Sequence, residues 1–289
     1  PRKGQPDYKN LTIYANNVVL AAGPVGTSRL LLKSKINPNG KVGMKFTTQP
    51  GSMHLARYDK NIEIRGWDGI NDSTEVHQFA DIFRNESYYD KNRHGFLLES
   101  ALSLPWGMAN LLPGYGKEHL ELMRDLNHWS GIEIILKSDS YGRITEDQIK
   151  FDISERDNEA MLFATWVIAR IFFRTGAKEI RLGLPGLLLK SPNQLDEIFN
   201  YRYGGGKAKG YMVKQANLYS GHHFGGAIMG VDRKESFADE TGECHDIKGL
   251  WVADGSAFPT NVGVNCAMSI MFVARKISDH FIAKVKSSQ

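Results

Sequence analysis

The stretch GLWVADGSAFPTNVGVNCAMSIMFVARKISDHF, residues 249–281, joins a short apolar strand to an apolar helix through a loop that contains glycine and proline. The strand is expected over residues 250–253 and the helix is expected to begin near Asn265. Asp254 and Gly255 form the turn that follows the strand. Backbone N–H groups at the start of a helix have no partner within it, so they can hold an anionic or polar ligand. An ordinary strand-to-helix connection has the same pattern.

Two segments further upstream add to this pattern. The first, NVVLAAGPVGTSRLLLKS at residues 17–34, predicts the end of a strand that begins near Leu11, a glycine turn, and a helix over about residues 26–33. The second is GHHFGGAIMG at residues 221–230. In the first segment Ala22 and Gly23 are small enough to let the backbone approach a ligand closely.

In order and separation, the three segments resemble the C-terminal half of the glucose-methanol-choline (GMC) family of FAD-dependent oxidoreductases. That family has an AAG-type turn before a G-T-x-R-L-L helix, then H-x-x-G-x-x-x-M-G, then D-G-S-x-x-P-x-x-x-G-x-N. The matching residues here are 21–32, His222, Gly225, Met229, Gly230, Asp254, Gly255, Ser256, Pro259, Gly263 and Asn265. The chain is more similar to the members that act on sterols or long-chain alcohols than to the sugar oxidases. Sterol oxidases typically have Pro and an aromatic residue after this Asn, where this chain has Cys266 and Ala267, which weakens a sterol assignment.

The resemblance implies a fold of mixed α+β and α/β class. It consists of part of an FAD-binding Rossmann-like domain plus a substrate domain built on a mostly antiparallel sheet with helices on one side. The expected division is residues 1–44 for the FAD-binding domain, 45–235 for the substrate-binding domain, and 236–289 for the return to the FAD-binding domain. The sequence has no G-x-G-x-x-G after a strand and begins with Pro1, so a missing N-terminal segment of the same enzyme is expected as a partner.

The middle of the chain has its own local signals. Residues 131–153, GIEIILKSDSYGRITEDQIKFDI, form two alternating runs around a turn and predict a hairpin. A helix is expected from Asp157 to Thr175, closed by Gly176. Ser191 and Pro192 predict the start of another helix. The run GGGKAKG at residues 204–210 lacks the phosphate-loop pattern and is interpreted as a surface loop.

The resemblance also implies the residues of the active site. His222 corresponds to the catalytic base, and a neutral imidazole is a suitable acceptor for the hydroxyl proton of an alcohol. Asn265 corresponds to its partner, which orients the same oxygen or bonds to the flavin. Glu99 is the third candidate catalytic residue: it faces either the substrate cavity, where burial would raise its pKa, or the solvent.

The implied cofactor is FAD, and no metal is expected. The residues implied beside the cofactor are Ala22, Gly23, Asp254, Gly255, Asn265, Cys266 and Ala267. The implied substrate is a small-molecule alcohol of apolar or sugar-like character. Its electrons pass to O₂ in an oxidase, or to a quinone or cytochrome partner in a dehydrogenase, and an inactive homologue or fragment is the non-enzymatic alternative.

Composition excludes some other classes. The 289 residues are 42% apolar and 24% charged, as in ordinary globular proteins, and the net charge of +4 is too small to indicate a nucleic-acid partner. The apolar run at residues 160–173 is too short for a transmembrane segment and contains Arg170. Cys244 and Cys266 leave a disulfide open, and localisation is open as well.

Overall fold

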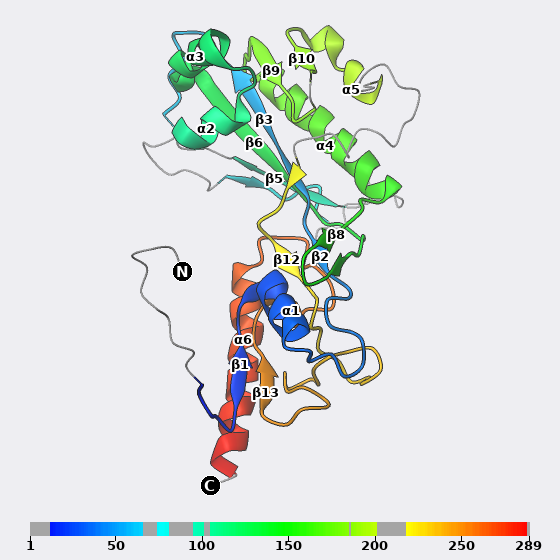
Figure 1. Cartoon of the computed structure of the whole chain (residues 1–289). Coiled ribbons are helices and arrows are strands. Elements are labelled where there is room, and N and C mark those ends of the chain that lie inside the picture. The colour runs from blue at the N-terminus through cyan, green and yellow to red at the C-terminus, as the bar shows by residue number, and fades with distance from the viewer. Residues whose placement is uncertain are drawn as a thin grey trace, which may run out of the picture.

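The computed structural model describes residues 12–65, 74–80, 95–100, 105–184, 186–200 and 218–287. Within them the chain forms two parts, one above the other in Figure 1. We call the lower one the terminal part, because both ends of the chain build it, and the upper one the central part. The predicted loop at residues 204–210 lies outside the described residues.

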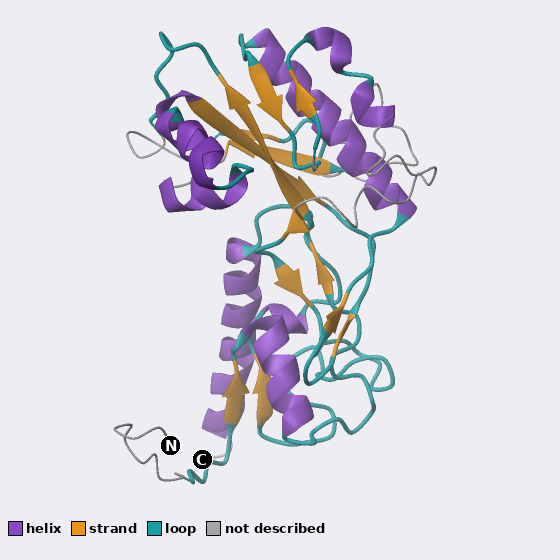
Figure 2. Ribbon diagram, turned by 45° about the horizontal axis from the view of Figure 1, so that its top comes forward, coloured by secondary structure: helices purple, strands orange, loops and turns teal. Residues whose placement is uncertain are grey.

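The terminal part contains a parallel pair of strands and two helices. Strand β1 (Val18–Leu20) pairs with β13 (Leu250–Val252), and α1 (Gly23–Lys33) and α6 (Ala267–Ser287) lie beside them (Figure 1, Figure 2). Their core includes Leu31, Phe237, Trp251 and Ile277. This confirms a strand-to-helix unit at each end of the chain.

The first strand and helix differ in extent from the prediction. A strand over residues 11–20 was expected, but among the described residues it begins only at Val18, because its partner β13 offers three residues for pairing. Helix α1 starts at Gly23 and not near Gly26. Gly23 has the left-handed φ of 72°, and Pro24 then sets a helical φ in the first turn.

The central part is built on a seven-stranded antiparallel sheet, which confirms the predicted sheet type. Its strand order is β10-β9-β3-β6-β5-β4, and β11 pairs with β3 as a side branch. The strands are β3 (Gly51–Arg57), β4 (Glu75–Val76), β5 (Phe96–Ser100), β6 (Trp129–Leu136), β9 (Glu179–Arg181), β10 (Leu188–Leu189) and β11 (Leu218–Tyr219).

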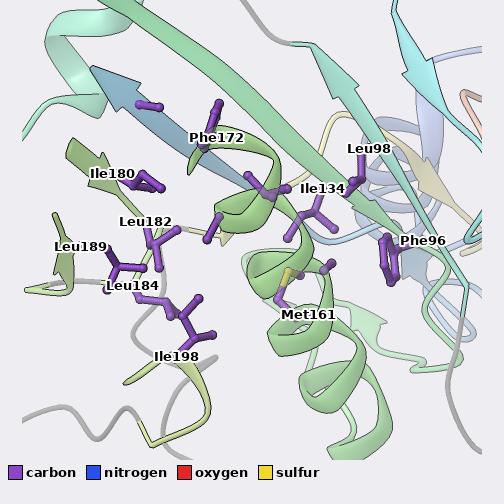
Figure 3. Packing of buried hydrophobic residues seen from close by; sticks show 14 of the residues in the cluster. Phe96, Leu98, Ile134, Met161, Phe172, Ile180, Leu182, Leu184, Leu189 and Ile198 are labelled. Atoms are coloured by element: carbon purple, nitrogen blue, oxygen red, sulfur yellow. The ribbon is translucent and has the colours of Figure 1, made fainter. Parts of the chain in front are cut away.

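Helix α4 (Glu155–Arg174) covers one face of this sheet and forms the main core, shown in Figure 3. Ser154 caps its first turn by accepting from the N–H of Asp157, and the helix ends before Gly176, as predicted. The next expected helix is a 3₁₀ turn, η2 (Pro192–Gln194), with a capping box at Ser191, followed by α5 (Glu197–Asn200).

Helices α2 (Pro105–Leu111) and α3 (Gly116–Arg124) pack on the opposite face, so helices lie on both sides of the sheet and not on one. Leu55 of β3 and Trp129 of β6 point to this face and contact Met108 of α2 in a second core. Their neighbours along the strands, such as Ala56, point to α4. Alternation along each strand therefore gives the sheet two buried faces.

The hairpin predicted over residues 131–153 is wrong in its pairing. Strand β6 pairs with β3 and β5, and the hairpin is made instead by β7 (Arg143–Ile144) and β8 (Ile149–Lys150). The chain turns away from β6 because the hydroxyls of Ser138 and Ser140 donate to the buried carboxylate of Asp157 at the start of α4. This side-chain network decides the local path over the alternating pattern.

A short antiparallel ladder lies between the two parts. It consists of β2 (Thr47–Thr48) and β12 (His223–Phe224), with His223 opposite Thr48 (Figure 1). His222 immediately precedes β12, so the fold places this predicted site residue between the terminal and central parts.

Candidate active site

His222 is held by its backbone at this junction. Its N–H donates to Ser220 Oγ at 3.2 Å, and its carbonyl accepts from Thr48 Oγ1 at 2.9 Å and from the N–H of Gln49 at 3.2 Å. These bonds fix the position of the residue, whereas the imidazole itself has no hydrogen-bond partner within the described part of the chain. The half-buried imidazole is therefore available to a ligand.

Burial lowers the pKa of His222, and the negative charge of Glu133 opposes that shift. A lowered pKa keeps the imidazole neutral at neutral pH, which is the state a general base requires. Burial also lowers the pKa of His223, and the neighbouring His222 adds to this effect. The ring of His223 packs against Phe46, with 5.7 Å between the centroids. Of the two adjacent histidines, His223 is thus the one engaged in packing.

Three carboxylates line up across the central sheet. Glu75, Glu99 and Glu133 are direct cross-strand partners on β4, β5 and β6, so their side chains share one face. Glu99 is only 8% exposed, which excludes the solvent-facing alternative for this residue. Its Oε1 atom has no hydrogen-bond partner among the described residues. Tyr219 of β11 donates its hydroxyl hydrogen to Glu133.

Burial raises the pKa of Glu99 to about 7, a hydrogen bond from Asn265 acts in the opposite direction, and the charges of Glu133 and Glu75 raise it further. The contact with Asn265 links the start of α6 in the terminal part to the central sheet. The fold therefore brings together Glu99 and Asn265, which are far apart in the sequence. The charge of Glu133 also raises the pKa of His222, so Glu133 acts on both Glu99 and His222.

The three residues from Asn265 to Ala267 differ in solvent exposure. Asn265 and Ala267 are exposed, whereas Cys266 is buried in a cluster with Phe224 and Phe258. Burial raises the pKa of the Cys266 thiol. The side chain of Cys266 thus belongs to the core, and only its backbone is left to contact a ligand. Both cysteines are free.

Asp254 ties the two ends of the chain together. Its Oδ2 atom accepts from the Gly23 N–H at 3.0 Å and from Thr27 Oγ1 at 2.6 Å, and its Oδ1 atom accepts from the Ser256 N–H at 2.7 Å. The last bond caps a 3₁₀ turn, η6 (Gly255–Ala257). The carboxylate therefore holds α1 against the turn after β13.

The glycines beside Asp254 have different surroundings. A Cβ added to Gly255 would lie 2.9 Å from the carbonyl oxygen of His223, so this glycine lets η6 approach β12 closely. A Cβ added to Gly23 would meet no atom within 4 Å, and Ala22 is exposed. The backbone at Ala22 and Gly23 therefore borders open space.

Sequence reasoning missed three residues of this cluster. Glu133, Tyr219 and Gln49 were not singled out as site residues. Gln49 is buried and donates from Nε2 to the carbonyl of Val264 at 3.2 Å, while its N–H bonds to His222. It therefore joins His222 to the segment that carries Asn265. A charged Glu133 within an otherwise apolar strand is a signal in the sequence that could have found this residue. Its neighbours in the cluster come from distant segments, so the sequence does not show the cluster itself.

Metal-binding clusters and membrane-spanning helices are both absent from the part of the chain that the structure describes. It contains no group of His, Cys, Asp and Glu side chains that could hold a metal ion. It also contains no helix long and apolar enough to cross a membrane.

Comparison with known proteins identifies relatives of the whole chain. An uncharacterized GMC-type oxidoreductase of Mycobacterium tuberculosis is 29% identical, covering 98% of this chain and 42% of its own length. A long-chain-alcohol oxidase of Arabidopsis thaliana is 26% identical, covering 96% of this chain and 37% of its own length. This chain therefore spans less than half the length of the curated relatives it matches.

Solved structures share the fold at lower identity. Pyridoxine 4-oxidase from Mesorbium loti superposes with a TM-score of 0.60 at 14% identity, over 94% of this chain and 52% of that one. Formate oxidase from Aspergillus oryzae RIB40, in a structure concerned with FAD modification, gives a TM-score of 0.60 at 15% identity, over 94% and 55%. The family model described as GMC oxidoreductase matches residues 133–274. Residues 133–274 thus match the GMC oxidoreductase family, and the rest of the chain is similar to its members.

Proposed function

We propose that this chain supplies the substrate side and part of the cofactor side of an FAD-dependent alcohol oxidoreductase, with His222 as the general base. The observation that carries the proposal is the position of His222, a half-buried imidazole that Gln49 joins through hydrogen bonds to the segment before α6 and on which the charge of Glu133 acts. Alcohol oxidases among the relatives support the substrate class.

The residues present fit FAD. The exposed backbone at Ala22, the open space beside Gly23, and the exposed Asn265 and Ala267 offer small, neutral groups that a flavin can approach. Asp254 and Gly255 would hold this region in shape, because their contacts are within the chain. A bound FAD would supply the acceptor for the hydride that leaves the carbinol carbon.

The chain's own side chains would orient the substrate and accept its hydroxyl proton. His222 Nδ1 or Nε2 takes the hydroxyl proton as the alcohol is oxidised, since the neutral imidazole has a free lone pair. Asn265 orients the alcohol oxygen through its amide without adding charge. Glu99 is hydrogen-bonded to Asn265 and fixes the orientation of that amide. Because its pKa is raised to about 7, Glu99 is also the second group that can hold a proton. Glu133 and Tyr219 complete the polar wall.

Two features extend the proposal to partners. Val18 and Val19 of β1 are 48% and 47% exposed, and consecutive strand residues point to opposite faces, so both faces of β1 are open at this point, whereas its partner β13 is buried. Parallel strands are normally covered on both faces, and Met268 and Phe272 add exposed apolar area on α6. We therefore propose that a further segment of the same protein covers this surface. Either O₂ or a quinone or cytochrome partner serves as electron acceptor.

The test is anaerobic spectroscopy on the natural gene product that contains this chain. A flavin absorbance band is expected, and it should bleach when an alcohol substrate is added. The 289-residue chain alone is the comparison, and it is expected to retain no flavin because the apolar surface of its terminal part lacks its cover. A natural product without a yellow cofactor, or one that no alcohol reduces, would contradict the proposed function.

The substitution Glu99→Gln is expected to stabilise the protein increasingly as the pH rises from 4.5, the ordinary value for this group, to about 7. The raised pKa means that folded Glu99 keeps its proton where the unfolded chain has released it, so wild-type stability falls across this window. Glutamine is neutral at every pH and avoids this loss. Thermal midpoints measured across the window, with the exposed Glu121→Gln of α3 as control, test the effect. Parallel curves for wild type and Glu99→Gln would show that Glu99 titrates normally.

A further inference from the structure

The segment of residues 261–265 leads from η6 towards α6 and carries Asn265 at its end. Among the described residues it forms no helix or strand and makes no backbone–backbone hydrogen bond. Asn265 itself is exposed, so its side chain is not held in place by packing. The position of its amide therefore depends on the contacts that hold this segment.

Two buried amides hold the segment near its two ends. Asn261 donates from Nδ2 to the Ser138 carbonyl at 2.6 Å and to Thr47 Oγ1 at 3.3 Å. Gln49, just before β3, donates from Nε2 to the Val264 carbonyl at 3.2 Å. Asn261 is 3% exposed and Gln49 is 2% exposed, so water competes little for these bonds. The segment is thus tied at both ends to the chain on either side of the central sheet.

The acceptors determine how each amide is oriented. Ser138 and Val264 offer carbonyl oxygens, which only accept, so the NH₂ group of each amide has to face them. Among the described residues, Asn261 Oδ1 and Gln49 Oε1 have no hydrogen-bond partner. Both side chains therefore act through their N–H donors, and a side chain of similar size without donors would remove the contact.

The acceptors of Asn261 are fixed in turn by the start of α4. Thr47 Oγ1 donates to the Ser140 carbonyl at 2.9 Å. The hydroxyls of Ser138 and Ser140 donate to the buried carboxylate of Asp157. A buried network that is bonded at several points is rigid. The segment is therefore anchored to the core of the central part.

Gln49 contacts the segments of two candidate site residues. Its backbone N–H donates to the His222 carbonyl at 3.2 Å, while its side chain holds Val264, the residue before Asn265. A substitution at this position changes the side chain and keeps the main-chain bond. It therefore acts on the placement of Asn265 and leaves that of His222 unchanged.

We propose that Gln49 and Asn261 are positioning residues that hold Asn265 where its amide can reach the oxygen of the substrate alcohol. The inference rests on the proposed function and adds two residues to the same site. Both act through Asn265, and neither contacts the substrate.

The variants Gln49→Met and Asn261→Leu test the proposal, because each keeps the approximate size of the side chain and removes its donors. In the natural gene product, each should slow anaerobic flavin reduction by an alcohol by up to about 100-fold, the effect of misplacing a reacting group by about 1 Å. In an Asn265→Ala background the same substitutions should cause no further slowing. Asn39→Leu is the matched control, because the Asn39 amide also donates to two carbonyls, at 2.9 and 2.7 Å, in a different loop. Its rate should stay at the wild-type value.

A second measurement does not depend on turnover. The hydrogen bond from Asn265 lowers the pKa of Glu99, against burial and the charges of Glu133 and Glu75. Displacement of Asn265 in either variant should raise this pKa above about 7, so the stability gained by Glu99→Gln should keep growing above that pH. Thermal midpoints of each variant with and without Glu99→Gln measure this, and the control should show the wild-type window.

Equal slowing in the wild-type and Asn265→Ala backgrounds would show that the two amides support the fold in general. That result, or wild-type rates in both variants, would overturn the inference and leave the proposed function intact. A wild-type gene product whose flavin no alcohol reduces would overturn the proposed function, and the thermal midpoints would still decide whether the amides hold Asn265 against Glu99. If one variant does not fold, the other carries the test.

Discussion

Replacing His222 by alanine is expected to slow the anaerobic reduction of the flavin by an alcohol by about 10²–10⁴-fold, the usual contribution of a general base. The half-buried imidazole of His222 has a lowered pKa, so it is neutral at neutral pH and can accept the hydroxyl proton of the alcohol. The measurement is the rate of flavin bleaching after rapid mixing with substrate, because this step reports proton and hydride transfer without the electron acceptor.

His223→Ala is the matched control for this effect. It removes the adjacent imidazole, which packs against Phe46 at the junction, and should lower stability more than it lowers the rate. Both variants should keep their flavin, so that a slow rate reflects chemistry. If His223→Ala slows bleaching as strongly as His222→Ala, or if His222→Ala reduces its flavin at the wild-type rate, the base has been assigned to the wrong residue.

The pH profile provides an independent view of the same residue. A base acts when it is deprotonated, so the rate should fall as the pH drops through the pKa of His222. Burial lowers that pKa from its ordinary value of 6.5. The acid limb of the wild-type profile should therefore lie below this value, and it should be lost in His222→Ala.

Much of the terminal part was predictable because its signals are local. The turn at Ala22 and Gly23 and the turn at Asp254 and Gly255 depend on small residues and on a capping carboxylate within a few positions. The same holds for the end of α4 before Gly176, whereas the helix begins at Glu155, two residues before the predicted Asp157, because Ser154 caps it. The domain boundaries at residues 44 and 235 and the roles of the site residues stay predictions.

The rest of the site depended on long-range pairing, which the local pattern does not contain. The row of Glu75, Glu99 and Glu133 exists only because β4, β5 and β6 are neighbours in one register. A shift of one residue would place Glu133 on the α4 face. The sequence of one strand does not decide whether Glu99 is buried. Its burial depends on the neighbouring strands β4 and β6 and on Asn265 from the terminal part.

The substitution Asp254→Ala is expected to lower the free energy of unfolding by about 3–4 kcal/mol, because it removes a charged acceptor and leaves its donors without a partner. Those donors are the Gly23 N–H, the Thr27 hydroxyl and the Ser256 N–H. The first two are 231 and 227 residues away in the sequence. The loss should therefore separate α1 from the turn after β13, and flavin retention should fall with stability.

Asp239→Ala separates this long-range role from the loss of hydrogen bonds as such. The Asp239 carboxylate also accepts three bonds, from the N–H and hydroxyl of Thr241 and from the N–H of Glu243, but all of them are local. Chemical denaturation and flavin content should show a smaller loss for Asp239→Ala than for Asp254→Ala. Equal losses would mean that the bonds matter only locally. If Asp254→Ala kept both wild-type stability and flavin, the carboxylate would not be what holds the two ends of the chain together.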